Sequence, residues 1–216
     1  LDNITDIRSD SMVREIDRDL YDQDGIILDQ IGASAAGQLP KGFDPSSLYP
    51  ARQHPKALQM TIFGMGDALG QLGVDWKIIQ EKIAPDEVAV FSGAAIGQLD
   101  GFGFGGLMQS RSKGSRASSK NLALGLVEMS ADFINAYILG SVGRTGHVVG
   151  ACATFLYNLQ MGKEAIESGS ARFVVVGGAE APITPEIVDG FYAMSALSDD
   201  KRMMEMQAQH LSLIHI

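Results

Sequence analysis

Residues 151–178, ACATFLYNLQMGKEAIESGSARFVVVGG, contain a helical pattern followed by a strand pattern. The first part predicts a helix from Cys152 to about Ser168, because apolar residues recur there at helical spacing. The residues expected on one apolar face of this helix are Phe155, Leu156, Leu159 and Ile166. The run from Phe173 to Gly178 then predicts a short strand that is apolar on both faces, and such strands are buried between layers of helices.

The chain upstream shows the same alternation of helices and strands. A helix is predicted from Lys56 to near Gly73, because it carries an apolar stripe at steps of three and four. The stripe consists of Leu58, Ile62, Met65, Leu69 and Leu72. Residues 76–83 predict a short helix capped by Asp75, and residues 87–92 predict a short buried strand.

A second apolar stripe predicts another helix over residues 122–137, with Gly140 past its end. Its members are Leu122, Leu126, Met129, Phe133, Ile134 and Tyr137. They are expected either in the core or on a dimer surface. A glycine-rich stretch, residues 93–106, and a polar basic loop to Lys120 precede this helix. The alternation of strands and helices points to a layered α/β fold with a largely central sheet.

Composition limits the class of protein. The chain has 216 residues, 45% of them hydrophobic, which is enough for a sizeable core and excludes global disorder. Its 17 Lys and Arg against 26 Asp and Glu give a net charge of −9, which argues against broad nucleic-acid binding. No apolar run approaches the roughly 20 residues of a membrane span, and no export signal is expected. A single cysteine, without a Cys/His cluster of metal-site spacing, favours a reducing, cytoplasmic setting.

The two ends differ in character from the rest of the chain. Residues 1–24 hold eight acidic residues and three arginines, and we expect 1–44 to form an acidic, irregular opening segment. The last residues, 211–216 (LSLIHI), resemble an in-frame translation of a common transposase sequencing adapter, so 208–216 is interpreted as a non-native tail. A genuine short apolar tail is the alternative. On the first interpretation the chain is a fragment of a longer protein.

Cys152 is the strongest single candidate for chemistry. It lies among small residues, in Gly150-Ala151-Cys152-Ala153-Thr154, immediately before the predicted helix. The positive end of a helix dipole and unpaired backbone N–H groups favour the thiolate there, and the thiolate is the nucleophilic form. On this local pattern alone, a small buried hydrophobic residue explains Cys152 equally well.

Three linked motifs around Cys152 resemble the β-ketoacyl-acyl-carrier-protein synthases, which are condensing enzymes of the thiolase superfamily. The motifs are GHVVGACATFLYNLQMG (146–162), FVVVGGAEAPITP (173–185) and GFYAMSALS (190–198). Upstream, VAVFSGAAIG (88–97) is similar to the strand and turn before the family's dimer-forming region. LYPARQHPKAL (48–58) looks most like a longer bacterial branch that includes initiating synthases. The resemblance implies a thiolase-like α-β-α-β-α fold, with its N-terminal half present and residues 45–207 as a partial ketosynthase domain.

The resemblance implies a decarboxylative Claisen condensation in fatty acid or polyketide biosynthesis. The Cys152 thiolate would take an acyl group from acyl-CoA or acyl carrier protein, and malonyl carrier protein would supply the attacking carbanion. The Cys152 backbone N–H would donate to the oxyanion, Ile96 and Phe191 would line the acyl pocket, and Arg52 and Lys56 would dock the carrier protein. No cofactor is implied beyond the phosphopantetheine of the substrates, and a homodimer is expected for the full-length protein.

The family's catalytic histidines, supporting lysine and second oxyanion donor belong to a C-terminal half. His54, His147, His210 and His215 match none of these motifs, so the fragment itself is expected to be inactive. Another thiolase-superfamily acyltransferase, such as a thiolase or a hydroxymethylglutaryl-type synthase, remains an alternative. So does a non-catalytic partner subunit of a ketosynthase, which Cys152 argues against, and an α/β binding domain without chemistry.

The remaining signals are weaker. Gly101–Gly106 is glycine-rich but lacks the strand–turn–helix succession of a dinucleotide site, and no clear helix opens from it. Ser110–Lys113 fits S-x-x-K but falls in a polar loop, which favours chance. A positive stretch, formed by Arg111, Lys113, Arg116 and Lys120, would steer an acidic carrier protein, although a solvated loop is the better interpretation. His147 is expected to be structural.

Overall fold

In the computed structural model, the described residues are 13–15, 35–37, 42, 44–45, 53–180 and 183–197. The chain forms two compact units, one of residues 45–182 and one of residues 1–44 with 183–216. The larger unit has one parallel sheet with helices packed on it, which confirms the α/β class expected from the sequence. The expected opening segment at 1–44, domain at 45–207 and tail at 208–216 stay predictions.

The smaller unit contains two short strands and one helix among its described residues. Strand β1 (Val13–Glu15) pairs antiparallel with β2 (Ala35–Gly37). Helix α8 (Pro185–Ala193) begins with a proline, which suits a first helical turn because a backbone N–H, which proline lacks, would have no partner within the helix there. The helix ends before Ser195, whose φ of 57° lies in the left-handed region that stops a helix.

The sheet of the larger unit has three parallel strands in the order β4-β3-β5. The central strand β3 (Val88–Ser92) is buried along its whole length. It lies between β4 (Thr145–Gly146) and β5 (Phe173–Gly177), and β5 pairs with it over all five positions. The strands predicted at 87–92 and 173–178 are therefore confirmed.

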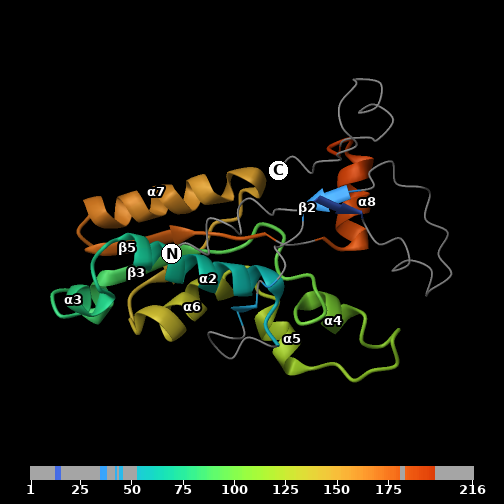
Figure 1. The fold of residues 1–216 in the computed structure, drawn as a ribbon, viewed down its shortest axis with the longest axis horizontal. Coiled ribbons are helices and arrows are strands. Elements are labelled where there is room, and N and C mark those ends of the chain that lie inside the picture. Colours follow the sequence, from blue (N-terminus) through green and yellow to red (C-terminus); the bar gives the residue numbers. More distant parts are fainter. Residues whose placement is uncertain are drawn as a thin grey trace. The chain divides into compact units, whose positions relative to one another are not determined.

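Helices cover both faces of this sheet. Helix α7 (Thr154–Glu167) packs on β3 and β5 along one face, whereas α6 (Met129–Ile134) and α2 (Lys56–Gln71) lie on the other (Figure 1). Side chains alternate across β3, so Val88 and Val90 face the α2 and α6 side while Ala89 and Phe91 face α7. In this layered arrangement both faces of the central strand are buried.

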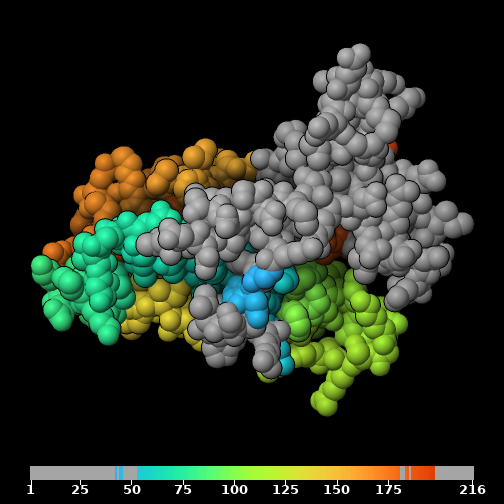
Figure 2. All heavy atoms as spheres, in the orientation of Figure 1, coloured from blue at the N-terminus to red at the C-terminus, as the bar shows by residue number. Residues whose placement is uncertain are grey.

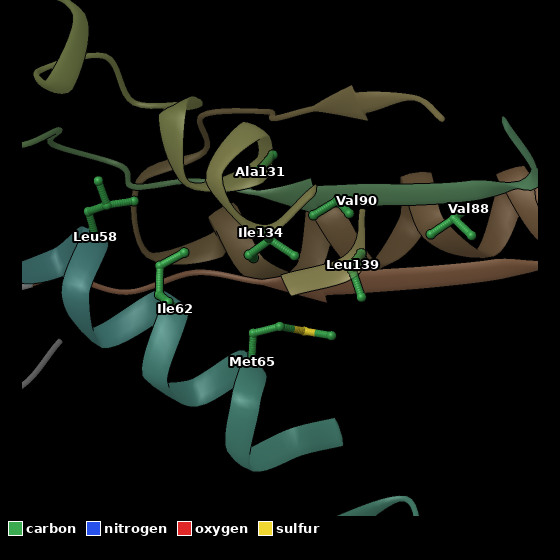
Figure 3. Packing of buried hydrophobic residues seen from close by; sticks show 8 residues of the cluster. All are labelled: Leu58, Ile62, Met65, Val88, Val90, Ala131, Ile134 and Leu139. Atoms are coloured by element: carbon green, nitrogen blue, oxygen red, sulfur yellow. The ribbon is translucent and has the colours of Figure 1, made fainter. Parts of the chain in front are cut away.

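The main core cluster joins α2 to the sheet. Leu58, Ile62 and Met65 point from α2 toward α6 and β3 in Figure 3. The full cluster consists of Leu58, Ile62, Met65, Val88, Val90, Ala131, Ile134 and Leu139. The predicted stripe of α2 is confirmed at these three positions, while Leu72 follows the last helical residue and is half exposed.

Helix α3 (Trp76–Gln80) is hydrogen-bonded to the end of the helical segment that follows α6. Its first turn is capped by Asp75, whose carboxylate accepts a backbone N–H at 3.0 Å, as the sequence predicts. Trp76 Nε1 and Gln80 Nε2 donate to the carbonyl oxygen of Leu139 at 3.1 and 2.6 Å. That carbonyl lies at the end of a helical segment, where it would otherwise lack a partner.

The helix predicted over 122–137 is interrupted, so that prediction is wrong as a single element. The chain instead forms α5 (Ser119–Leu124), then α6, then a π-helical turn at Asn135–Leu139. The carbonyl oxygen of Val127, in the interruption, accepts the N–H of Ala94 at 3.0 Å. The break therefore binds the loop that follows β3.

The side chains of the apolar stripe predicted over residues 122–137 differ in their burial. Ile134 is 1% exposed and belongs to the core, and Phe133 packs against it. Leu122 and Tyr137 are 55% and 54% exposed. The stripe therefore lies partly in the core, and its exposed side chains, such as Leu122 and Tyr137, are accessible at the surface.

Helix α7 packs on the sheet through small and polar residues. Its buried residues are Thr154, Asn158, Gly162 and Ala165. The apolar face predicted from Phe155, Leu156, Leu159 and Ile166 is exposed, with Leu156 at 62%, and α7 lies at the surface in Figure 2. The reason is close approach, because a Cβ on Gly162 would lie 2.7 Å from Val176 Cγ2, so a larger residue would push the helix away from β5.

Candidate active site

Parallel strands bring three segments of the chain to one edge of the sheet. Residues 93–97 follow β3, residues 147–153 follow β4, and residues 178–180 follow β5. Because the carboxyl ends of parallel strands meet at the same edge, the loop 93–97 lies beside the start of the segment that carries Cys152, where His147 Nε2 is 2.9 Å from the carbonyl oxygen of Ala94. Binding sites of α/β sheets lie at such edges.

Cys152 is exposed in a short 3₁₀ turn, Ala151–Ala153, that leads directly into α7. Ala151, immediately before it, has a φ of 49°, a left-handed conformation that is unfavourable for a residue with a Cβ. Strained backbone of this kind persists only where its surroundings hold it. At Gly150 a Cβ would collide with the ring of Tyr157, so a larger residue there would displace that half-exposed side chain.

Thr154 holds the turn in place. Its buried hydroxyl donates to the carbonyl oxygen of Ala151 at 2.7 Å and accepts the N–H of Gly150 at 3.0 Å. The two bonds close the backbone around Cys152 from the first residue of α7. The thiol is therefore presented to solvent at a rigid position.

A second polar network connects the turn to α7 and to the loop 93–97. Asn158, which is 0% exposed, accepts the N–H of Val148 at 3.0 Å and lies 3.0 Å from His147 Nδ1 through its amide nitrogen. The other ring nitrogen of His147, Nε2, is 2.9 Å from the carbonyl oxygen of Ala94. The ring also occupies the space where a Cβ on Gly93 would stand. Both ring nitrogens of His147 therefore have hydrogen-bond partners, which agrees with the structural role expected for this residue.

Glu180 holds the loop 93–97 from the other side. Its Oε1 accepts the N–H of Ala95 and, at 3.2 Å, the N–H of Ile96. Its Oε2 is buried and accepts no hydrogen bond among the described residues. Burial raises the pKa of the Glu180 carboxyl, while the two N–H groups and an electrostatic interaction with His147 act to lower it.

The glycine-rich stretch 101–106 is a packing element. Asp100, just before it, accepts the backbone N–H of Lys56 at 2.7 Å and that of Phe102 at 2.9 Å. A Cβ on Gly103 would collide with the Gln98 carbonyl oxygen, so close backbone packing requires the glycine. A short helix, α4 (Phe104–Met108), does open here, contrary to the sequence expectation, but it starts well after β3 ends.

The predicted site residues fall at different places. Ile96 is half-buried in the loop 93–97, where Glu180 holds its N–H. Lys56 is the exposed first residue of α2, while Arg52 lies outside the described residues. Phe191 is half-buried in α8 of the smaller unit. The roles predicted for these four residues and for Cys152 stay predictions.

The structure shows the surroundings of two further sequence signals, the S-x-x-K match at Ser110 and the basic stretch. Ser110 is buried, and its hydroxyl donates to the carbonyl oxygen of Leu107 at 2.8 Å, which fits a chance match to S-x-x-K. In the basic stretch, Lys120 Nζ donates to Gln53 Oε1 at 3.2 Å, so that end of the stretch lies beside the start of α2. The positive side chains at 111, 113, 116 and 120 are all exposed.

Sequence reasoning missed Glu180 and Asn158. Glu180 is the acid of the G-G-A-E motif, and an ionisable residue directly after a buried strand is the signal that would have found it. Asn158 was missed because the buried face of α7 was expected to consist of the apolar residues of that helix. An amide at helical spacing from Thr154 and Gly162 marks the face that packs.

Two classes of feature are absent from the part of the chain that the structure describes. No helix there is long and apolar enough to cross a membrane. No group of three or more His, Cys, Asp or Glu side chains lies close enough together there to hold a metal ion.

Comparison with known proteins places the chain in a family. The model of the β-ketoacyl synthase N-terminal domain matches residues 6–209. The chain belongs to the β-ketoacyl synthase family. The resemblance drawn from the three motifs around Cys152 is thereby confirmed at the level of the family.

Individual synthases agree with this assignment. The chain is 58% identical over 167 residues to the β-ketoacyl-[acyl-carrier-protein] synthase FabY of Pseudomonas aeruginosa, covering 77% of this chain and 26% of the relative. It is 31% identical over 148 residues to the 3-oxoacyl-[acyl-carrier-protein] synthase 2 of Staphylococcus aureus, covering 68% of this chain and 36% of the relative. The chain thus spans about a quarter to a third of these curated synthases.

Solved ketosynthase structures share the fold. The crystal structure of the ketosynthase FabY from P. aeruginosa superposes with a TM-score of 0.77 at 55% identity, covering 82% of this chain and 28% of that chain. A β-ketoacyl synthase from Burkholderia phymatum superposes with a TM-score of 0.68 at 20% identity, covering 93% of this chain and 47% of that chain. The thiolase-like ketosynthase fold expected from the sequence is confirmed.

Proposed function

We propose that this chain is the cysteine-bearing part of a β-ketoacyl-acyl-carrier-protein synthase, with Cys152 as the nucleophile. The observation that carries the proposal is the turn itself. An exposed thiol follows a left-handed alanine at the start of a long helix. From within that helix Thr154 holds the turn at Ala151, and Asn158 holds the preceding segment at Val148. Membership of the synthase family supports the same assignment.

The proposed reaction has two stages at the same sulfur. The Cys152 thiolate attacks the acyl thioester, the C–S bond to the donor's phosphopantetheine breaks, and the released thiolate takes up a proton. Malonyl carrier protein then loses CO₂, and the electron pair of the broken C–C bond attacks the acyl-cysteine carbonyl. The C–S bond to Cys152 breaks, which releases the β-ketoacyl product and restores the thiolate.

The backbone supports each tetrahedral intermediate. In this proposal the N–H of Cys152 donates to the oxyanion, because it lies at the amino end of α7 where backbone N–H groups and the helix dipole favour negative charge. The second oxyanion donor and the catalytic histidines belong, by the family resemblance, to the half of the enzyme beyond this sequence. The chain by itself is therefore proposed to be inactive in condensation.

Substrate contacts follow the same proposal. Ile96 and Phe191 line the acyl pocket, and Arg52 with Lys56 dock the acidic carrier protein. The substrates are acyl-CoA or acyl carrier protein and malonyl carrier protein, with no cofactor beyond their phosphopantetheine. We place the complete enzyme in the cytoplasm as a homodimer, acting in fatty acid or polyketide biosynthesis. The similarity to synthases named for acyl carrier protein supports the choice of carrier.

The test uses the complete gene product of the source, with Cys152→Ala and Cys152→Ser beside the wild type. We expect acyl transfer to position 152, seen by mass spectrometry, and condensation with malonyl carrier protein, both lost in the two variants. Ser110→Ala is the matched control, since its hydroxyl is buried and bonded to Leu107. Condensation by Cys152→Ala at the wild-type rate would overturn the proposal. Acylation without use of malonyl carrier protein would favour another acyltransferase of the superfamily.

A further inference from the structure

His147 is hydrogen-bonded at both ring nitrogens, and the two partners fix its tautomer. Nε2 faces the carbonyl oxygen of Ala94, which can only accept, so Nε2 carries the proton. Nδ1 faces the amide nitrogen of Asn158, which can only donate, so Nδ1 presents its lone pair. The amide itself is oriented by Val148, whose N–H binds the Asn158 oxygen at 3.0 Å.

Each bond of the ring leads to a different part of the candidate site. Ala94 belongs to the loop 93–97, which also carries Ile96 and is held from its other side by Glu180. Val148 starts the segment that runs into the Cys152 turn, and Asn158 fastens it to α7. The imidazole thus stands between the proposed acyl-pocket loop and the proposed nucleophile.

Space around the ring is closed on the loop side. The His147 ring fills the position where a Cβ on Gly93 would stand, and Asn158 is completely buried. A ring packed in this way cannot rotate without breaking both hydrogen bonds. Its geometry therefore suits a fixed spacer better than a mobile proton carrier.

We propose that His147 is a positioning residue that joins the loop 93–97 to the Cys152 turn, with Nε2 setting the loop and Nδ1, through Asn158, setting the turn. The inference rests on the proposed function of Cys152. It assigns His147 no proton transfer in the reaction. A histidine offers a donor at Nε2 to Ala94 and an acceptor at Nδ1 to Asn158. A single Asn or Gln side chain at position 147 would reach only one of these two partners.

Two substitutions separate the two halves of this role in the complete protein. The side-chain amide of His147→Gln reaches the position of Nε2 and keeps a donor for Ala94, but it offers no acceptor to Asn158. His147→Asn reaches the position of Nδ1 and keeps that acceptor, but it loses the Ala94 contact. Loss of one neutral hydrogen bond corresponds to an effect of about three- to tenfold.

The two readouts are the alkylation rate of Cys152 by iodoacetamide and the ratio of kcat/KM for long and short acyl donors. We expect His147→Asn to change the acyl-length ratio by about threefold or more, with alkylation within about twofold of wild type. We expect His147→Gln, and Asn158→Leu with it, to change alkylation by about threefold or more while the acyl-length ratio is kept. Gln71→Ala, on the exposed end of α2, is the control for a surface change.

A purely structural role would move both readouts by the same factor in both variants, and that result would overturn the inference. A spectroscopic measurement does not depend on activity. In ¹⁵N-histidine-labelled wild-type protein, the signals missing from His147→Asn should show the neutral Nε2–H tautomer at neutral pH. An Nδ1–H tautomer or an imidazolium would overturn the inference even if Cys152 is the nucleophile. Condensation by Cys152→Ala would instead refute the proposed function and leave the tautomer assignment standing.

Discussion

A Cβ placed on Gly162 of α7 would lie 2.7 Å from Cγ2 of Val176 on β5. The same atom would lie 3.0 Å from Cγ1 of Val174. Both valines are branched at Cβ and have little freedom to turn away. The distance between α7 and the sheet is therefore set by the absence of a side chain at one position.

Substitution of Gly162 by alanine is expected to destabilise the fold. Overpacking costs about 1–3 kcal/mol, and the better helix propensity of alanine returns up to about 1 kcal/mol, so the net loss is about 1 kcal/mol. Urea unfolding of the chain measures it. Gly66→Ala in α2 is the matched control, because a Cβ there would meet no atom within 4 Å apart from its neighbours and the backbone of its own helix, and it should stabilise by about 0.5–1 kcal/mol. Equal effects of the two substitutions would contradict the packing argument.

The left-handed Ala151 predicts opposite effects for two substitutions. Glycine adopts this conformation freely, so Ala151→Gly should stabilise the chain by about 0.5–1 kcal/mol after its extra freedom in the unfolded state is counted. Ala151→Val should destabilise it by more than about 1 kcal/mol, because a β-branched residue is strongly disfavoured there. Thermal unfolding of both variants checks the pair. If valine is tolerated as well as glycine, the turn does not hold this backbone conformation.

Glu180 predicts a pH dependence of stability. Because burial raises the pKa of its carboxyl in the folded state, its contribution is most favourable below the ordinary pKa and declines as the pH rises through the raised value. His147 is the titratable group noted beside it. Glu180→Gln keeps an oxygen acceptor for Ala95 and Ile96 but cannot ionise. We expect the variant to gain stability relative to wild type as the pH rises from the ordinary carboxyl pKa through the raised one. A difference that does not change with pH would contradict this.

The proposed docking of the carrier protein at Arg52 and Lys56 predicts a change in KM. Reversing the charge of Lys56 together with Arg52 should raise the KM for malonyl carrier protein in the complete enzyme, with kcat nearly unchanged and the effect smaller at high salt. Arg111→Glu with Lys113→Glu makes the same change of charge on the exposed basic stretch and serves as the control. If only the control pair raises the KM, docking belongs to that stretch.

Elements with a strong local pattern were predictable from the sequence. The stripe of α2 and the apolar run of β3 each carry their own periodicity, and Asp75 provides a cap whose position needs no tertiary information. The Cys152 turn was also predictable, because small residues before a helix are readable along the chain. These features depend on residues that are close in sequence.

The remaining features depend on partners that are distant in sequence. In the interruption after α5 the Val127 carbonyl accepts the N–H of Ala94, a contact that no helical period reveals. The buried face of α7 is chosen by the close approach at Gly162, which outweighs the larger apolar residues on the other face. Glu180 finds its two N–H partners some 85 residues upstream, so its role follows only from strand order.

The Asp100 carboxylate has a consequence for the exchange of segments between synthases. One of its oxygens holds the backbone N–H of Lys56, and the other holds that of Phe102 in its own loop. The start of α2 has no capping side chain from its neighbours in sequence. A chimera that imports the loop from a relative without an acid at this position would leave the first turn of the recipient's helix frayed. The loop and the helix start should be inherited as one block, with a crossover placed elsewhere.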